Sequence, residues 1–290
     1  MKTSIGNRRK KTNFSEILRR LSKNKLAMIG LVVIICLFLM AIFANLIIPY
    51  DYSKQDYSAV LQKPSREHLF GTDELGRDVF SRVVYGTRYS LRMGLLTVAV
   101  AAVLGTLLGS FAGFYGGAVD NILMRILDIF QSIPILVFAI ILAAALGPGL
   151  NNAIIAMGVS TMPLYARLIR ASIMQEEGNE YVEAAKAINA SDMRILFRHV
   201  LPNAISPMII HITMSIGYSI LVASTLSFLG LGAQPPTPEW GAILSEGRNH
   251  MRDHGYLLFY PGMMIMISVL SFNLLGDGLR DALDPRLKGN

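Results

Sequence analysis

The chain alternates between long apolar stretches and shorter polar segments. Six stretches contain no charged side chain, and they cover residues 26–48, 93–114, 129–147, 150–166, 204–233 and 255–276. A helix of the 23 residues in the first stretch would be about 35 Å long, enough to cross a hydrocarbon core of ~30 Å. Since backbone groups in lipid must be hydrogen-bonded within the chain, helices are expected. The pattern predicts an all-α membrane protein with six transmembrane helices.

Two of the stretches have features of their own. The fourth, 150–166, contains two asparagines, a serine, a threonine and a proline, so we expect it to face protein or a water-filled path rather than lipid. In the second, Gly105, Gly109 and Gly113 form two overlapping G-x-x-x-G units. Such a row of small residues lets another helix approach closely.

The charged residues follow the alternation of the stretches. The net charge is +7 and the pI about 9.5, which by themselves would fit a nucleic-acid-binding protein. However, 18 of the 27 Lys and Arg residues lie in the segments on one side of the six stretches, and 9 lie on the other side. The positive-inside rule then places both termini in the cytoplasm, and nucleic acid is not expected as a partner. With Cys36 as the single cysteine, a disulfide scaffold is excluded.

The N-terminal tail carries a helical pattern before the first stretch. Its apolar positions are Phe14, Ile17, Leu18 and Leu21. Asn13 and Glu16 have the spacing of a capping box, and basic residues occupy the opposite face. We expect an amphipathic helix on the inner leaflet of the bilayer. The alternative is a disordered basic tail that only sets the topology.

The residue patterns of several kinds of catalytic site are missing. No lysine follows a glycine, so the phosphate-binding G-x-x-x-x-G-K-[ST] loop is absent. His250 and His254 have a metal-like spacing, but they lie in a predicted outer loop without a third ligand, which favours a plain polar loop. We therefore expect no catalytic, cofactor or metal site, and no enzyme activity. His211 lies within the fifth stretch, where it would serve either a hydrogen bond between helices or a substrate contact in the translocation path.

The segment between the fourth and fifth stretches, residues 175–203, is rich in helix-forming residues. Its distinctive positions are Glu183, Ala184, Ala185, Asn189, His199, Leu201 and Pro202. They resemble the EAA loop of permease subunits of ATP-binding-cassette importers, with the pattern Glu-Ala-Ala, three residues, Gly, nine residues, Ile, one residue, Leu-Pro. Asn189 stands for the glycine and His199 for the isoleucine. Asparagine tolerates a left-handed backbone well, so the first replacement is expected to keep the turn.

The resemblance implies that this loop docks against a separate ATPase and transmits force. Small side chains at Ala184 and Ala185 would permit close approach. The charged side chains expected to orient the partner are Glu183, Lys186, Arg194 and Arg198. The apolar side chains that can be buried are Ile195, Leu196 and Phe197. Pro202 is expected to stop the helix before the next span.

Three further segments are similar to the "C" permease subunit of dipeptide, oligopeptide and nickel importers. They are residues 68–78, 234–241 and 273–286. The resemblance implies a type I ATP-binding-cassette importer permease with a MetI-like core in the inner or plasma membrane of a bacterial cell. That core would be five helices in residues 86–290. Residues 1–85 would supply the inner-leaflet helix, the first span and an outer segment.

The same resemblance implies a function and a set of partners. The chain would form half of the translocation path for di- or oligopeptides, together with a second permease in a heterodimer, two ATP-binding subunits and an extracytoplasmic solute-binding protein. ATP would bind the partner subunits. The alternatives within the family are a nickel or metal-chelate importer and a glutathione importer. Alternatives from other classes are a secondary transporter driven by an ion gradient, disfavoured because the six stretches hold no charges, and a membrane anchor without a substrate path.

Overall fold

The computed structural model describes residues 19–283, and residues 1–18 and 284–290 lie outside this range. Most of the expected inner-leaflet helix, including Asn13 and Glu16, therefore falls outside the described residues. Residues 19–21 are helical, and Leu21 packs in a small apolar cluster with Ala27 and Ala282.

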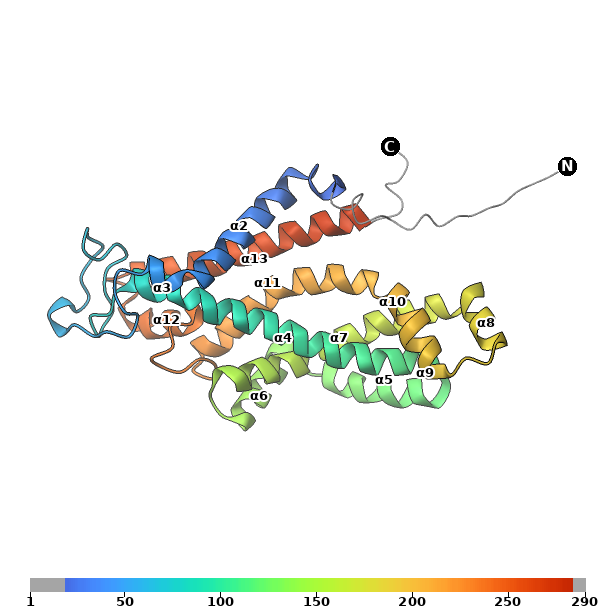
Figure 1. Cartoon of the computed structure of the whole chain (residues 1–290). Coiled ribbons are helices and arrows are strands. Elements are labelled where there is room, and N and C mark those ends of the chain that lie inside the picture. Colours follow the sequence, from blue (N-terminus) through green and yellow to red (C-terminus); the bar gives the residue numbers. More distant parts are fainter. Residues whose placement is uncertain (1–18, 284–290) are drawn as a thin grey trace.

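Within residues 19–283 all regular secondary structure is helical; there is no strand, only one isolated bridge between Thr72 and Asp78 (Figure 1). The α-helices are α2 (Lys25–Ile42), α3 (Ala44–Ile47), α4 (Val79–Tyr115), α5 (Gly117–Gln131), α6 (Ile135–Leu146), α7 (Leu150–Glu177), α8 (Glu180–Ala187), α9 (Asp192–Arg194), α10 (Leu201–Ala204), α11 (Ser206–Phe228), α12 (Trp240–Gly247) and α13 (Tyr256–Leu283). Short turns of other helix types are η1 (Tyr57–Ala59), η2 (Ile195–Val200) and η3 (Arg248–His250).

Within residues 19–283, five helices are long and apolar enough to cross a membrane, namely α2, α4, α7, α11 and α13. The third expected span is not one helix, because α5 and α6 meet at 87° across residues 132–134. Pro134 stands at the break; a proline lacks an N–H and disfavours helical backbone at the residue before it. A sixth crossing exists if this bent pair counts as one span.

The α4 helix is longer than the apolar stretch that predicts it. It begins at Val79, whereas the charge-free stretch begins at residue 93, so the helix itself carries Arg82, Arg88 and Arg92. Its 37 residues correspond to about 55 Å, more than the thickness of the hydrocarbon core. Arg88 donates to the backbone carbonyl of Ile42 at the end of α2, at 2.9 Å. The expected boundary between residues 85 and 86 falls inside this continuous helix.

The most extensive contact between two helices in the described chain joins α4 to α7. A Cβ atom added to Gly105 would lie 2.5 Å from Cβ of Tyr165, and one added to Gly109 would overlap the carbonyl oxygen of Ala166. Gly113 faces the carbonyl oxygen of Arg170 in the same way. The glycine row therefore allows close helix approach, as the sequence predicts. In the apolar window of α7, 67% of the residues are buried, against 22% in α2, which confirms that the fourth stretch faces protein.

The segment between α3 and α4 lies against the helices at one end of the molecule (Figure 1). Its turns rest on hydrogen bonds from side chains to the backbone, such as those from Tyr256 to the carbonyls of Gln62 and Thr72 at 3.0 and 2.9 Å. Hydrogen bonds from the hydroxyl and backbone N–H of Ser58 hold the pKa of the Asp56 carboxyl below its usual range.

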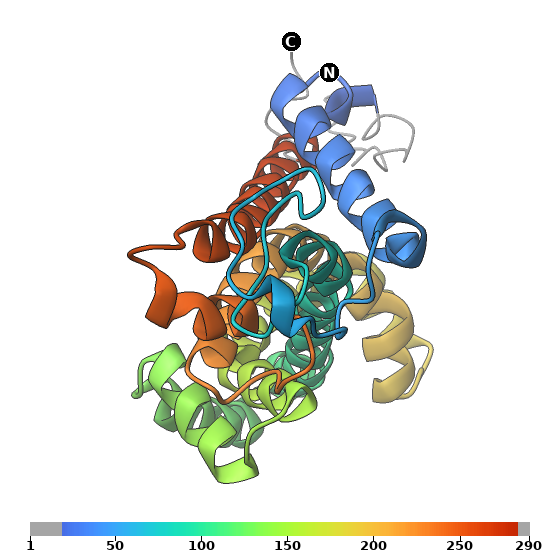
Figure 2. The same cartoon turned by 90° about the vertical axis from the view of Figure 1, so that its left-hand side faces the viewer.

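The molecule has two distinct ends. The segment between α3 and α4 and helix α12 lie at one end, and α8 and α9 lie at the opposite end (Figure 1). Both views show α2 lying beside α13 (Figures 1 and 2), where Gly30 of α2 closely faces the carbonyl oxygen of Ser271. The start of α2 and the end of α13 point toward the end that carries α8.

Candidate functional site

The segment with the Glu-Ala-Ala pattern forms α8, a turn, and a second helical section from α9 through η2 to α10. Asn189 occupies the turn in a left-handed conformation, with φ +58°. The N–H of Ala190 donates to the carbonyl of Ala185 at 3.1 Å, and that of Asn189 donates to Lys186 at 2.9 Å. These two bonds are those of a Schellman motif with Asn189 at its left-handed position. The expectation that asparagine keeps the turn is confirmed.

One face of α8 packs against the chain itself. Val182 and Ala185 are buried in the same apolar cluster as Ile195, Leu196 and Val200. The sequence predicted that both alanines would permit close approach of another protein. Only Ala184 is exposed, whereas Ala185 is buried on the face that meets its own chain.

The charged side chains of the loop point into solvent. Lys186 forms an exposed ion pair with Glu177, with 3.1 Å between Nζ and Oε1. Glu183, Arg194 and Arg198 are exposed and form no ion pair with any residue in the range 19–283. These three charges remain accessible to a second protein.

Apolar side chains lie exposed among these charges. Ile195 and Leu196 are buried as expected, but Phe197 is 42% exposed, contrary to the expectation that it is buried. Ile188 is 80% exposed, and Met193 is exposed as well. Exposed apolar residues rimmed by charges are typical of a protein-protein contact surface. The sequence alone does not indicate that Ile188 and Met193 are exposed, because both fit the helical spacing of apolar residues that is typical of a buried face.

Pro202 does not end the helix. The turn before it is η2, a π-helical turn in which the N–H of Leu201 donates to the carbonyl of Leu196. Pro202 is the second residue of α10, which leads through Ile205 into α11. A proline has no N–H to donate. The helical hydrogen bonds before it therefore change locally to the wider π-helical spacing, and the helix continues. Leu201 is half-buried and Pro202 exposed.

His211 is half-buried on α11. Its ring packs edge-on against Tyr165 of α7, with 4.9 Å between the ring centroids. It forms no hydrogen bond with any described side chain or backbone group, so the hydrogen bond between helices that the sequence suggested is not found, and the contact with α7 is a ring contact. A role in the translocation path stays a prediction.

At the opposite end, four charged side chains form a buried cluster that the sequence pattern did not reveal. Asp73 accepts from Arg77 at 2.7 Å and also from Arg82. Glu246 of α12 accepts from Arg77 at 2.7 Å and from Arg82 at 2.6 Å. The two cations and two carboxylates balance, and they tie α12 to the start of α4. Only the four-residue spacing of Asp73 and Arg77 could have indicated part of it.

Another buried carboxylate, at Glu239, holds the loop that precedes α12. Glu239 is fully buried and accepts from the hydroxyls of Ser90 and Ser224 at 3.0 and 2.9 Å. Its other oxygen accepts from the N–H of Ala242 at 3.1 Å, which caps α12. One side chain therefore joins α4, α11 and α12. Nearby, His250 lies 3.3 Å from Glu74, and the described residues contain no cluster of three metal-ligating side chains.

Comparisons with known proteins agree with this arrangement. Residues 105–289 match the family described as binding-protein-dependent transport system inner membrane component, and residues 12–64 match the N-terminal TM domain of oligopeptide transport permease C. The chain is 46% identical over 273 residues to the dipeptide transport system permease protein DppC of Alkalihalophilus pseudofirmus, covering 94% of this chain and 90% of the relative. It is 46% identical over 280 residues to the glutathione transport system permease protein GsiD of Escherichia coli O157:H7, covering 96% and 92%.

The fold is similar to that of a solved transporter. Inward-facing structures of the MetNI methionine ABC transporter contain a chain that superposes with a TM-score of 0.55 at 21% identity. The match covers 70% of this chain and 97% of that one. This likeness indicates a shared fold.

Proposed function

Because this chain belongs to the family of binding-protein-dependent transport system inner membrane components, we propose that it forms half of the path by which an ATP-driven importer takes up short peptides. The main support for this proposal is that the chain is 46% identical, along nearly its whole length, to a dipeptide permease. The similarity to a glutathione permease fits the same class, since glutathione is itself a short peptide.

The partners that we propose are a second permease subunit, two ATP-binding subunits and an extracytoplasmic solute-binding protein. The α8 to α10 loop supports the ATPase contact, because it combines exposed charges at Glu183, Arg194 and Arg198 with exposed apolar side chains at Ile188 and Phe197. Movement of this loop, driven by ATP in the partner subunits, would switch the spans between outward and inward openings.

We further propose that both termini and the α8 to α10 loop face the cytoplasm of a bacterium. The excess of Lys and Arg on that side supports this orientation. The buried charges do not favour a secondary transporter. Arg77, Arg82, Asp73 and Glu246 neutralise one another at the outer end instead of lining a path.

The test is the variant Glu183→Lys in cells that depend on the importer. We expect uptake of a labelled dipeptide to fall and the ATPase subunits to be lost from the purified permease, while the amount of permease in the membrane stays the same. The matched control is Glu67→Lys, an exposed charge reversal at the opposite end, which should retain the ATPase subunits. Unchanged uptake and assembly in Glu183→Lys would contradict the coupling role.

Uptake in the unmodified cells separates the classes of transporter. Peptide uptake should stop when ATP is depleted and persist when an ionophore collapses the ion gradient. The reverse result would indicate a secondary transporter.

A further inference from the structure

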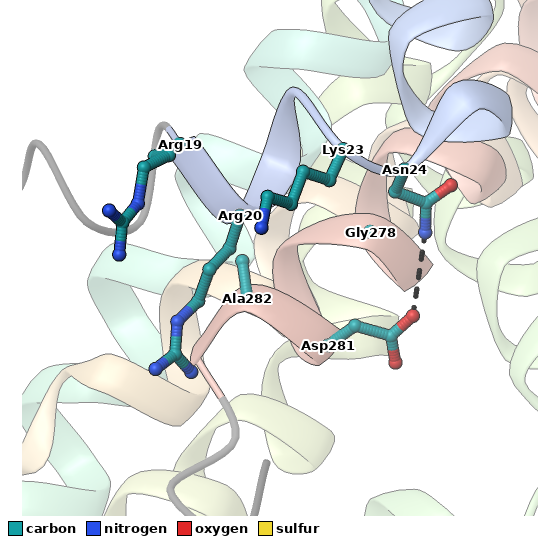
Figure 3. A pocket seen from close by; sticks show the side chains of 7 residues that line it. All are labelled: Arg19, Arg20, Lys23, Asn24, Gly278, Asp281 and Ala282. Atoms are coloured by element: carbon teal, nitrogen blue, oxygen red, sulfur yellow. Dashed lines mark hydrogen bonds between the residues drawn. The ribbon is translucent and has the colours of Figure 1, made fainter. Parts of the chain in front are cut away.

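A cavity of about 420 Å³ lies where the chain enters α2 and where α13 ends (Figure 3). Its size is within the range of small-ligand sites. The residues that line it are Arg19, Arg20, Lys23, Asn24, Gly278, Asp281 and Ala282. Three cationic side chains come from the segment before α2, and the one carboxylate among these described residues comes from the last turn of α13.

The cavity keeps an excess of positive charge. The side-chain nitrogen of Asn24 lies 3.5 Å from Asp281 Oδ2, as the dashed line in Figure 3 marks. Arg19 and Lys23 form no ion pair with any residue that the structure describes. Among the described lining residues, the two unpaired cations Arg19 and Lys23 therefore face one carboxylate, and that carboxylate is already in contact with an amide.

The walls of the cavity are fixed by helix packing. Asn24 caps α2, because its Oδ1 accepts from the N–H of Ala27 at 3.1 Å. Gly278 of α13 lies so close to Ala27 that an added Cβ would overlap it. Leu21 and Ala282 are buried beside them. The cationic side chains thus project from a packed corner between two helices.

The position along both helices places the cavity at the edge of the hydrocarbon core. The 18 residues of α2 begin at Lys25, directly after the lining residue Asn24, and they correspond to about 27 Å. In α13 the charge-free stretch ends at residue 276, just before Gly278. The cavity therefore lies at the depth of phospholipid headgroups.

We propose that this cavity binds the phosphate headgroup of an anionic phospholipid. Clustered Arg and Lys side chains bind phosphate through charge-assisted hydrogen bonds, and basic pockets on the cytoplasmic side of spans are suited to anionic headgroups. The bound lipid would fix the α2 and α13 pair in its leaflet. The choice of the cytoplasmic leaflet rests on the proposed orientation, whereas headgroup binding itself does not depend on the identity of the cargo.

The experiment measures lipid retained by the purified importer complex in mild detergent, by native mass spectrometry. The probes are phosphatidylglycerol and phosphatidylcholine with the same acyl chains. We expect preferential retention of phosphatidylglycerol, and a loss of about fivefold for each cation removed in the combined variant Arg19→Gln and Lys23→Gln. The matched control replaces two exposed cations of the segment between α3 and α4, with Lys54→Gln and Lys63→Gln, and should bind as the unmodified protein does.

A variant with the opposite expected effect guards against simple misfolding. Asp281→Asn removes the only carboxylate among the described residues that line the cavity and should raise the retention of phosphatidylglycerol. Equal retention of the two lipids, or unchanged retention in the combined variant, would overturn the proposal. Displacement of the lipid by millimolar inorganic phosphate or ATP would assign the site to a solution anion instead. Peptide uptake is measured separately, so a failure of the proposed cargo leaves the lipid result intact.

Discussion

Glu246 on α12 and Arg82 on α4 form an ion pair of 2.6 Å across 164 positions of sequence. Arg82 is almost completely buried, so its charge depends on Glu246 and Asp73 for compensation. Two buried cations joined to two carboxylates make a rigid connection only while every partner is present. Removing one leaves an uncompensated charge in a poorly solvated place.

The first prediction concerns this cluster. Glu246→Ala should lower the free energy of unfolding by about 3–5 kcal/mol, because Arg77 and Arg82 lose a shared partner. Thermal unfolding in detergent measures the change. Glu74→Ala removes a nearby but exposed carboxylate and should change stability by about 1 kcal/mol or less. Equal effects of the two variants would show that the cluster does not stabilise the fold.

The second prediction concerns Glu239. Glu239→Ala leaves the buried hydroxyls of Ser90 and Ser224 and the N–H of Ala242 without their acceptor. The free energy of unfolding should therefore fall by at least about 2 kcal/mol. Glu239→Gln keeps one carbonyl-type oxygen for the serines but turns an N–H₂ group toward Ala242. The free energy of unfolding of this variant should fall by less, about 1 kcal/mol. Unfolding midpoints of both variants, measured side by side, test this order.

The third prediction concerns the contact of α4 with α7. Gly109→Ala should destabilise the protein by about 1–3 kcal/mol, because the new Cβ would overlap the backbone of Ala166 and force the helices apart. Gly262→Ala is the control on α13, where nothing lies within 4 Å of the added atom. That change should be neutral or stabilising by up to about 1 kcal/mol. A neutral Gly109→Ala would mean that the helices separate without cost.

The fourth prediction concerns the turn of the α8 to α10 loop. Asn189→Gly should be tolerated, since glycine adopts a positive φ freely. Asn189→Val should lower the free energy of unfolding by about 1–2 kcal/mol, because a β-branched residue is strained in the left-handed region. In pull-downs of the tagged permease, Asn189→Val should retain less ATPase subunit than Asn189→Gly. If both retained the same amount, the turn would not matter for docking.

Much of the fold follows from one-dimensional patterns in the chain. Charge-free stretches long enough to cross lipid predict the helices, because the bilayer requires each span to satisfy its own backbone hydrogen bonds. The glycine row with Gly109 predicts close packing, and Asn189 predicts a left-handed turn. In both cases the structural requirement is local: the glycines leave room for a neighbouring helix, and asparagine tolerates a left-handed backbone.

The tertiary structure decided which faces are covered and which distant charges meet. Ala184 and Ala185 are neighbours with the same side chain, yet one is exposed and the other buried by η2. Phe197 is exposed beside the buried Leu196. The partners of Arg82 are separated from it by 9 and 164 residues, so no local pattern brings them together. Burial and buried ion pairs depend on what the rest of the chain places opposite a residue, and the sequence around that residue does not contain this information.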